Sequence, residues 1–249
     1  MISSRRCTSL LGLIPNATAL GLLCVLVLTA GLVACKSNDE GRGAARAPSV
    51  VDVTAVDYAF EAPDSIRSGW TTFRMQNEGE EHHLFPLEQL PDGIAYSDFQ
   101  AQVAATYDSL RSLRRTGSID AHAYRKGLLG SLPDWYFNRV EMTGGVSLTG
   151  PGRTATTTLR LTPGTYVMIC YVRTPDRRFH FLRGRARALT VTTDATGASP
   201  PEADRRITLS KLRIQADSSV SPGRRTIAVH FGEKRKGGPY GRWFQHLHL

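Results

Sequence analysis

The chain has 249 residues, of which 41% are hydrophobic and 21% charged, an ordinary globular composition that excludes wholesale disorder. Its formal net charge of +9 is unevenly spread. The last 49 residues hold 10 Lys or Arg against 4 Asp or Glu, whereas residues 35–200 hold 19 against 18. The main body is therefore nearly neutral, and we predict no nucleic-acid partner.

The N-terminus has the features of an export signal. Arg5 and Arg6 precede an apolar stretch over 17–33 with small residues near its end. Residues 32–35, Leu-Val-Ala-Cys, resemble a bacterial lipobox, so we expect a signal peptide over 1–34 and a lipid on Cys35. An uncleaved membrane anchor is the alternative, although the stretch is shorter than the ~20 residues of a membrane span.

Either outcome places the rest of the chain in the cell envelope. We expect a membrane-anchored lipoprotein that faces the periplasm or the exterior. Lys36 rather than Asp after the cysteine permits the outer membrane, by the rule known for enteric bacteria. Residues 35–48 are small, polar and charged, which predicts a flexible tether.

The cysteines point to one unusual thiol. Signal cleavage would remove Cys7 and Cys24, and the lipid would occupy Cys35. Cys170 would then be the single thiol of the mature chain, with no intramolecular disulfide partner in an oxidising compartment. It is either a buried small hydrophobe or a metal ligand.

Alternating apolar residues and turn signals predict strands on both sides of a helical segment. The expected strands lie over 51–66, 70–76, 83–90, 146–148, 154–161, 164–171 and 187–193. Spacings of three and four predict an amphipathic helix over 96–113, with an apolar face of Phe99, Val103, Tyr107, Leu110 and Leu113. A shorter helix is expected over 119–129. We therefore predict an all-β fold, an antiparallel β-sandwich over 49–193 with a helical insertion.

The C-terminal part is similar to the start of this sandwich. Residues 206–229 repeat the apolar positions of residues 52–75 at an offset of 154, and Gly223 matches Gly69. Only 44 residues remain from Arg206, which is too few for a second sandwich of this size. We predict a linker over 194–205, a truncated second copy over 206–249 and least order over 233–249.

The first domain carries side chains that bind transition metals. His82 and His83 follow an Asn-Glu-Gly turn and open a strand. Cys170 ends a strand, and His180 lies ten residues further on. Two imidazoles and a thiolate suit copper in a trigonal site with a weak axial fourth group, because the soft thiolate holds Cu(I) and the imidazoles stabilise Cu(II).

These residues lie in two motifs that resemble the cupredoxins, or blue copper proteins. The first is Asn-x-Gly-x-x-His over 77–82, and the second is Leu-x-Pro-Gly-x-Tyr-x-x-x-Cys over 161–170, followed by His180 and Gly184. The similarity is to the plastocyanin-like, lipid-anchored periplasmic kind with a helical insertion, and it covers about 51–191. It implies an eight-stranded Greek-key sandwich that binds one copper ion and passes single electrons to a redox partner of unknown identity.

The resemblance implies that the copper ligands are His82, Cys170 and His180. We prefer His82 to His83 because His82 would share a strand face with the apolar residues at alternate positions after it. The family's first ligand is also followed by apolar residues at that spacing. His83 is the alternative ligand.

One position departs from the family pattern. After Gly184 the family usually places an axial Met, whereas this chain has Arg185. A guanidinium cannot ligate a metal and would repel Cu(II), so we expect the Arg185 side chain to lie near the site and point to solvent. Met168 precedes Cys170 by two residues on the same strand and is expected in the core.

Two other functions stay open from the sequence. Arg185 and the incomplete second copy favour a copper-free cupredoxin scaffold that acts as a binding or structural module. Copper storage or delivery is the second alternative, and it predicts tight Cu(I) binding without reversible redox cycling. No nucleophile motif, Walker loop or Rossmann fingerprint occurs in the sequence, so we do not expect an enzyme.

Overall fold

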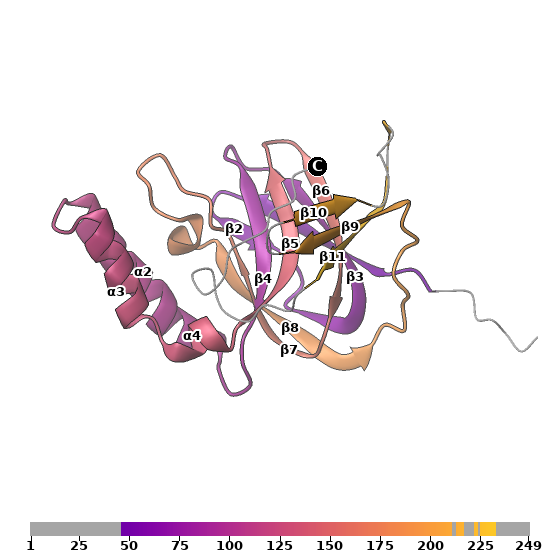
Figure 1. Cartoon of the computed structure of the whole chain (residues 1–249), viewed down its shortest axis with the longest axis horizontal. Coiled ribbons are helices and arrows are strands. Elements are labelled where there is room, and N and C mark those ends of the chain that lie inside the picture. The colour runs from indigo at the N-terminus through magenta and orange to yellow at the C-terminus, as the bar shows by residue number, and fades with distance from the viewer. Residues whose placement is uncertain (1–45, 211–212, 217–221, 224, 233–249) are drawn as a thin grey trace, which may run out of the picture. The chain divides into compact units, whose positions relative to one another are not determined.

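The computed structural model describes residues 46–210, 213–216, 222–223 and 225–232, and it shows a β-sandwich with a helical insertion (Figure 1). The predicted signal peptide, Cys35, the tether up to residue 45 and residues 233–249 lie outside the described residues. Within the described part of the chain, no helix is both long and apolar enough to cross a membrane.

Eight of the described strands form the sandwich. They are β1 (Ser49–Val56), β2 (Ala59–Glu61), β3 (Ser65–Asn77), β4 (His83–Gln89), β5 (Glu141–Thr149), β6 (Thr154–Leu161), β7 (Gly164–Ile169) and β8 (Ala186–Ala195). They pair in the order β2-β1-β3-β8-β7-β4-β5, and β6 also pairs with β3. The start of β3 pairs with β8, and its remainder pairs with β1 and β6, so this long strand takes part in both layers.

Gly69 lies where β3 passes from one layer to the other. Its φ of +108° is a conformation that favours glycine, and an added Cβ would fall 2.5 Å from Thr196 Oγ1. The pairing of β3 with β8 also shifts register between Arg67 and Ser68. This irregularity bends β3, so that one strand can hydrogen-bond in both layers around the core.

The pairing of the strands is mixed rather than antiparallel throughout. β1 runs parallel to β3, and β3 runs parallel to β8, while the other pairs of the sandwich are antiparallel. β2 pairs antiparallel with one edge of β1. The chain then reverses again and β3 pairs with the other edge of β1, so that β3 runs parallel to β1. The predicted fold class, an all-β sandwich with a helical insertion, is confirmed.

The sandwich encloses a core of large apolar side chains. The ring of Phe85 makes edge contacts with Phe60 and Phe73, at centroid distances of 5.6 and 5.7 Å. Cys170 belongs to the same buried cluster. The largest fully buried members of this cluster are Phe73, Met75, Phe85, Leu87, Leu161, Tyr166 and Met168.

The helical insertion lies between β4 and β5 and outside the strands, as predicted (Figure 1). It consists of α1 (Tyr96–Asp98), the π-helix η1 (Phe99–Ala104), α2 (Ala105–Arg115), α3 (Ala121–Ser131) and α4 (Asp134–Asn138). Phe99, Val103 and Tyr107 are buried on one face, whereas Leu113 in the last turn of α2 is 44% exposed. The predicted apolar face therefore packs over most of its length but not at its end.

A second apolar cluster joins the insertion to the segment that follows β7. The ring of Tyr107 on α2 meets Phe179 and Phe181 edge to face, at centroid distances of 5.9 and 5.4 Å. Phe179 and Phe181 flank His180 in the chain. The insertion thus supports the segment that carries one candidate ligand.

Three further strands form a separate small sheet, β9 (Arg205–Ser210), β10 (Arg213–Ala216) and β11 (Ile227–Phe231). β10 is antiparallel and β11 parallel to β9, as β2 and β3 are to β1. The register is also shared: Val53 pairs with Met75, and 154 residues later Ile207 pairs with Val229. The similarity of the two segments in sequence thus extends to their strand order and register.

Candidate functional site

His83, rather than His82, points into the sandwich. His83 begins β4 and is fully buried on the same strand face as Phe85 and Leu87, whereas His82 is exposed. The structure therefore corrects the preference for His82. The inward face is the one that carries Phe85, because its ring fills the space between Phe60 and Phe73. Phe85 and Leu87 follow His83 at alternate positions, but Leu84 and Pro86 follow His82 at the same spacing, so the apolar pattern alone does not identify this face.

The chain after β7 folds back on itself and brings His180 next to Cys170. His180 begins the 3-10 turn η2 (His180–Arg183), and its N–H donates to the carbonyl of Val172 at 2.9 Å. The N–H of Phe181 donates to the carbonyl of Cys170 at 3.1 Å. These backbone bonds fix the two side chains relative to each other although ten residues separate them.

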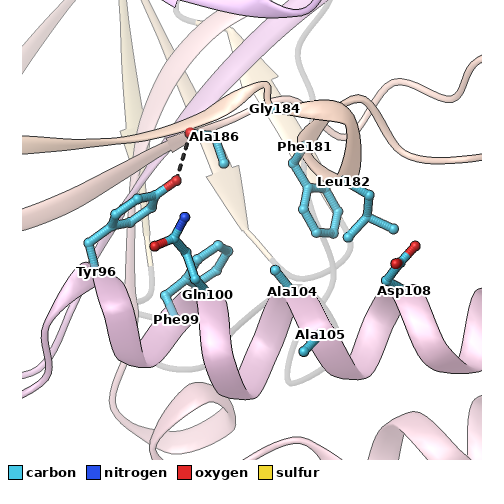
Figure 2. A pocket seen from close by; sticks show the side chains of 10 residues that line it. All are labelled: Tyr96, Phe99, Gln100, Ala104, Ala105, Asp108, Phe181, Leu182, Gly184 and Ala186. Atoms are coloured by element: carbon cyan, nitrogen blue, oxygen red, sulfur yellow. Dashed lines mark hydrogen bonds between the residues drawn. The ribbon is translucent and has the colours of Figure 1, made fainter.

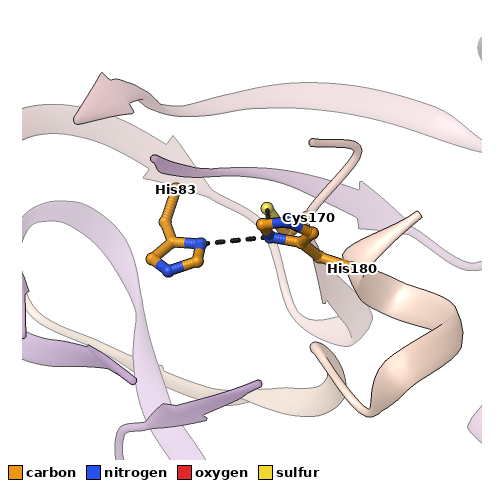
Figure 3. A group of neighbouring side chains, drawn as sticks. All are labelled: His83, Cys170 and His180. Carbon is orange, nitrogen blue, oxygen red and sulfur yellow. Dashed lines mark hydrogen bonds between the residues drawn. The ribbon is translucent and has the colours of Figure 1, made fainter. Parts of the chain in front are cut away.

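His83, Cys170 and His180 meet in one cluster (Figure 3). One potential ligand atom from each lies within 4.8 Å of the other two. The Nδ1 atoms of His83 and His180 are 3.2 Å apart, and the Sγ of Cys170 is 3.6 Å from the Nδ1 of His180. Ligand atoms bonded to one metal ion at ~2.0–2.3 Å lie roughly 3.3–4 Å apart, so the cluster has suitable dimensions for a single ion.

A carboxylate lies beside the Nε2 atom of each imidazole. His83 Nε2 lies 2.7 Å from Asp57 Oδ1, and His180 Nε2 lies 2.6 Å from Glu81 Oε2. The hydrogen bond to Asp57 keeps the proton of neutral His83 on Nε2 and leaves a free lone pair on Nδ1, and the nearby carboxylate of Glu81 favours the same tautomer in His180. Both Nδ1 lone pairs therefore converge beside the thiol, which is the arrangement that a metal ion requires.

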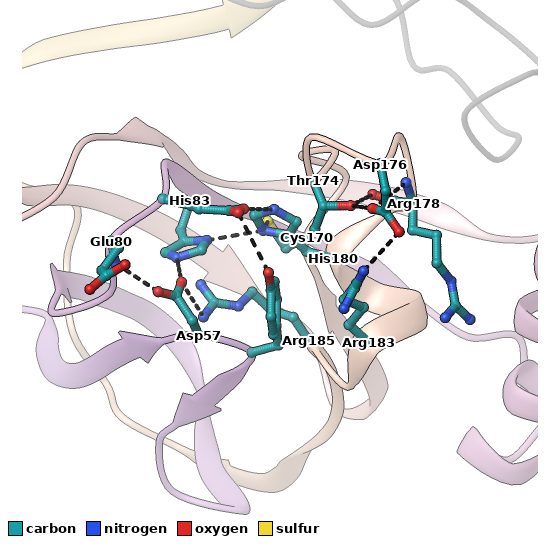
Figure 4. A network of polar contacts seen from close by, with 12 residues as sticks. Asp57, Glu80, His83, Cys170, Thr174, Asp176, Arg178, His180, Arg183 and Arg185 are labelled. Carbon is teal, nitrogen blue, oxygen red and sulfur yellow. Dashed lines mark hydrogen bonds and ion pairs between the residues drawn. The ribbon is translucent and has the colours of Figure 1, made fainter.

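The Asn-Glu-Gly turn before the histidines supports this arrangement. Asp57, from the segment between β1 and β2, accepts a hydrogen bond from the N–H of Glu80 at 2.7 Å (Figure 4). A Cβ on Gly79 would fall 2.5 Å from Asp57 Oδ1 and 2.9 Å from His83 Nε2, so glycine permits their contact. The Asn77 Oδ1 atom accepts a hydrogen bond from the N–H of Gly79, with 3.0 Å between the two heavy atoms, and this bond stabilises the turn.

Burial keeps the imidazoles neutral. Burial, followed by the positive charge of Arg185, lowers the pKa of His83 to about 4. Burial also lowers the pKa of His180. The pKa of the Cys170 thiol is raised by burial, while two backbone hydrogen bonds and Arg185 act in the opposite direction. The imidazoles are thus available as ligands at neutral pH, and a bound metal ion would displace the thiol proton.

Arg185 is buried rather than directed to solvent, which contradicts the sequence-based expectation. Its guanidinium lies over the ring of Phe60 at 5.1 Å, and its Nη2 is 3.7 Å from Asp57 Oδ1. The Arg185 N–H donates to the carbonyl of His180, and the Arg185 carbonyl accepts from the N–H of Cys170, each at 3.1 Å. With its backbone paired in this way, the Arg185 side chain points inward and lies beside the cluster (Figure 4).

The donor set fits copper. Two imidazole nitrogens and one thiol sulfur converge in a site from which water is excluded, because all three side chains are fully buried. Asp57 and Glu81, which support the imidazoles, are partly exposed at its rim. The thioether of Met168 belongs to the apolar core cluster, as expected.

No protein-family profile matches the chain, and no curated protein sequence matches it. Similar solved structures include the dithionite-reduced auracyanin of the photosynthetic bacterium Roseiflexus castenholzii, which is 20% identical with a TM-score of 0.34 over 59% of this chain and 98% of that chain. Auracyanin A, a "blue" copper protein of Chloroflexus aurantiacus, is 18% identical with a TM-score of 0.35, over 58% of this chain and 99% of that chain. Auracyanin B is 21% identical with a TM-score of 0.33, over 60% of this chain and 93% of that chain.

A groove of about 360 Å³ lies between the insertion and η2 (Figure 2). Its wall includes Phe99 and Phe181, and the Tyr96 hydroxyl donates to the carbonyl of Ala186 at 2.7 Å. None of the three donor residues of the cluster lines this groove. The groove is therefore distinct from the candidate metal site.

Proposed function

We propose that the protein binds one copper ion through His83, Cys170 and His180 and carries single electrons. The observation that supports this proposal most strongly is the convergence of two carboxylate-oriented Nδ1 atoms and one thiol in a buried site. Copper bound there would supply a one-electron Cu(I)/Cu(II) couple.

The residues of the chain would hold the ion with little rearrangement. His83 and His180 supply nitrogen donors that suit Cu(II), and Cys170 supplies a soft thiolate that suits Cu(I). Asp57 and Glu81 fix the orientation of the imidazole rings. Because the donors lie at the edge of a close-packed core, their positions would change little between oxidation states.

The proposal also includes the place of action. The N-terminal pattern supports a signal peptide over 1–34, a lipid on Cys35 and a tether over 35–48. The domain over 49–193 would then exchange electrons with a protein partner at the cell envelope, on the periplasmic or exterior side. The function requires neither enzymatic catalysis nor a nucleic-acid partner.

We further propose that 206–249 is a truncated second cupredoxin-like repeat, joined by the linker 194–205. Its support is the strand order and register shared at the offset of 154. Ile214 takes the place of Phe60 in this register, yet it is 66% exposed, compared with 7% for Phe60. The layer that covers Phe60 therefore has no equivalent over Ile214 among the described residues.

Copper titration of the purified, metal-free mature chain tests the function. One equivalent of Cu(II) should produce intense thiolate-to-copper absorption at roughly 600 nm, which reduction abolishes and reoxidation restores. A chain that binds neither Cu(I) nor Cu(II) would establish the copper-free scaffold. Tight Cu(I) binding without reversible cycling would establish storage or delivery.

The two adjacent histidines provide a matched pair of variants. His83→Ala should lose the absorption and weaken Cu(II) binding more than ~100-fold, since removing a group that merely orients a ligand already costs about 10–100-fold. His82→Ala should keep both, because its side chain is exposed. Competition titration with a Cu(II) chelator measures the affinities. Loss of the absorption in His82→Ala, with retention in His83→Ala, would contradict the assignment.

A further inference from the structure

We infer that the buried guanidinium of Arg185 sets the charge of the site and favours Cu(I) over Cu(II). This inference rests on the proposed copper site. It assigns a role to the residue that departs from the family pattern, without making that residue a ligand. Arg185 would act on the ion through its electric field.

The position of Arg185 is fixed by the backbone of two donor residues. Its N–H binds the carbonyl of His180, and its carbonyl binds the N–H of Cys170. The side chain is fully buried and lies against Phe60 and Asp57. The backbone of Arg185 is therefore held by the same two residues that supply the thiol and one imidazole, and its side chain is enclosed beside them.

Burial of this guanidinium is costly. None of its three nitrogens has a hydrogen-bond partner among the described residues, and its ion pair with Asp57 is long, at 3.7 Å. Arginine remains protonated in proteins, so the charge is retained. A buried, poorly paired charge destabilises the fold, and such a group calls for a functional explanation.

The charges around the cluster supply that explanation. Asp57, Glu81 and the Cys170 thiolate are three anionic groups, and Arg185 is the cation buried beside them. A monovalent ion would leave one net negative charge on this set, and a divalent ion would make it neutral. Without Arg185, the set would carry one more negative charge, which stabilises the divalent ion more than the monovalent one. At low dielectric this difference is large.

Three substitutions separate charge from structure. Arg185→Leu removes the charge and leaves the backbone bonds to Cys170 and His180 available. Arg185→Lys keeps a positive charge. Arg183→Leu is the matched control, because Arg183 carries the same charge two residues earlier, but it is partly exposed and paired with Asp176 at 2.8 Å. Should Arg185→Leu not fold, Arg185→Gln provides the same loss of charge with a polar side chain.

The measurement is the affinity of each full-length mature variant for Cu(I) and for Cu(II), each by competition with a chelator of that ion. Arg185→Leu should raise the ratio of Cu(II) to Cu(I) affinity at least tenfold, equivalent to lowering a one-electron potential by about 59 mV. Arg185→Lys and Arg183→Leu should stay within about threefold of the parent ratio. The potential measured by direct titration provides an independent readout.

Other outcomes overturn the inference. A ratio in Arg185→Leu within twofold of the parent, or an equal rise in Arg183→Leu, would show that Arg185 has no specific electrostatic role. Copper binding by Arg185→Leu but not by the parent chain would make Arg185 a group that excludes the metal. Binding of neither ion by any of these chains would overturn the proposed copper site itself, and the inference with it.

Discussion

Replacing Cys170 by serine should abolish the thiolate-to-copper absorption and nearly all copper affinity. Serine is close to cysteine in size, so the packing of the buried cluster should persist, but a hydroxyl is a hard, weakly acidic group that does not replace a thiolate for copper. The expected loss of Cu(I) affinity is at least ~1,000-fold, since the one soft donor of the cluster disappears. Competition with a Cu(I) chelator measures it.

Met168→Leu is the control for this experiment. Met168 is also fully buried and lies two residues before Cys170, on β7. Because its thioether belongs to the core cluster, the leucine variant should keep the absorption and the affinity. A Cys170→Ser chain that retains the absorption would contradict the assignment of the thiol. Loss of the absorption in Met168→Leu would show that the variant disturbs the core around Cys170, and Met168 would then not serve as a neutral control.

Replacing Glu88 by glutamine should stabilise the metal-free protein at pH 8 by about 3 kcal/mol and leave its stability at pH 4 nearly unchanged. Glu88 lies on β4 and is fully buried. It accepts a hydrogen bond from the Tyr171 hydroxyl, and the hydroxyls of Tyr171 and Tyr136 are 2.9 Å apart. Burial raises the pKa of Glu88 from 4.5 to about 7.

The direction of the pH dependence follows from the raised pKa. Below pH 4.5 the carboxyl is protonated in both folded and unfolded chains, and its full contribution to stability is present. Between pH 4.5 and about 7 the unfolded chain ionises first, so the free energy of unfolding falls. Above about pH 7 both states are ionised and the loss levels off. Glutamine cannot ionise, yet it still offers an oxygen to Tyr171.

Urea unfolding of parent and variant at pH 4 and pH 8 checks this prediction. Other groups also titrate in this range, so the relevant quantity is the change in the difference between the two proteins. Glu61→Gln, at an exposed position on β2, serves as the control and should show no such change. A stabilisation by Glu88→Gln that is equal at the two pH values would contradict the burial of a titrating carboxyl.

Much of the fold was predictable from the sequence, because the spacing of apolar residues indicates which side chains are buried. The spacing of Phe99, Val103 and Tyr107 indicated a helix, and these residues are buried on one helical face. The face of β4 was not predictable in the same way, because apolar residues occur at both alternating positions after His82 and His83. The larger ring of Phe85 decides which face turns inward, through contacts with strands distant in sequence.

The surroundings of the cluster were the least predictable part. Asp57 lies 26 residues before His83 and has no local pattern that links it to a metal site. Asp57 comes beside His83 because the end of β1 pairs with the end of β3 and accepts backbone hydrogen bonds from the turn that follows β3. The chemistry of a guanidinium predicts that the Arg185 side chain points to solvent. It points inward instead, at a position whose backbone bonds to Cys170 and His180. Local residue types thus revealed the donors, whereas tertiary pairing placed the charges around them.

The shared aromatic cluster between α2 and the segment after β7 means that the insertion is not a removable appendage. Phe179 and Phe181 stack on each other at 5.4 Å, and Tyr107 covers both of them. A shortened chain without the insertion would uncover these two rings, which lie on either side of His180 in the chain. An ancestor or an engineered chain that lacks these helices would therefore need other apolar cover for this turn before it could hold the imidazole in place.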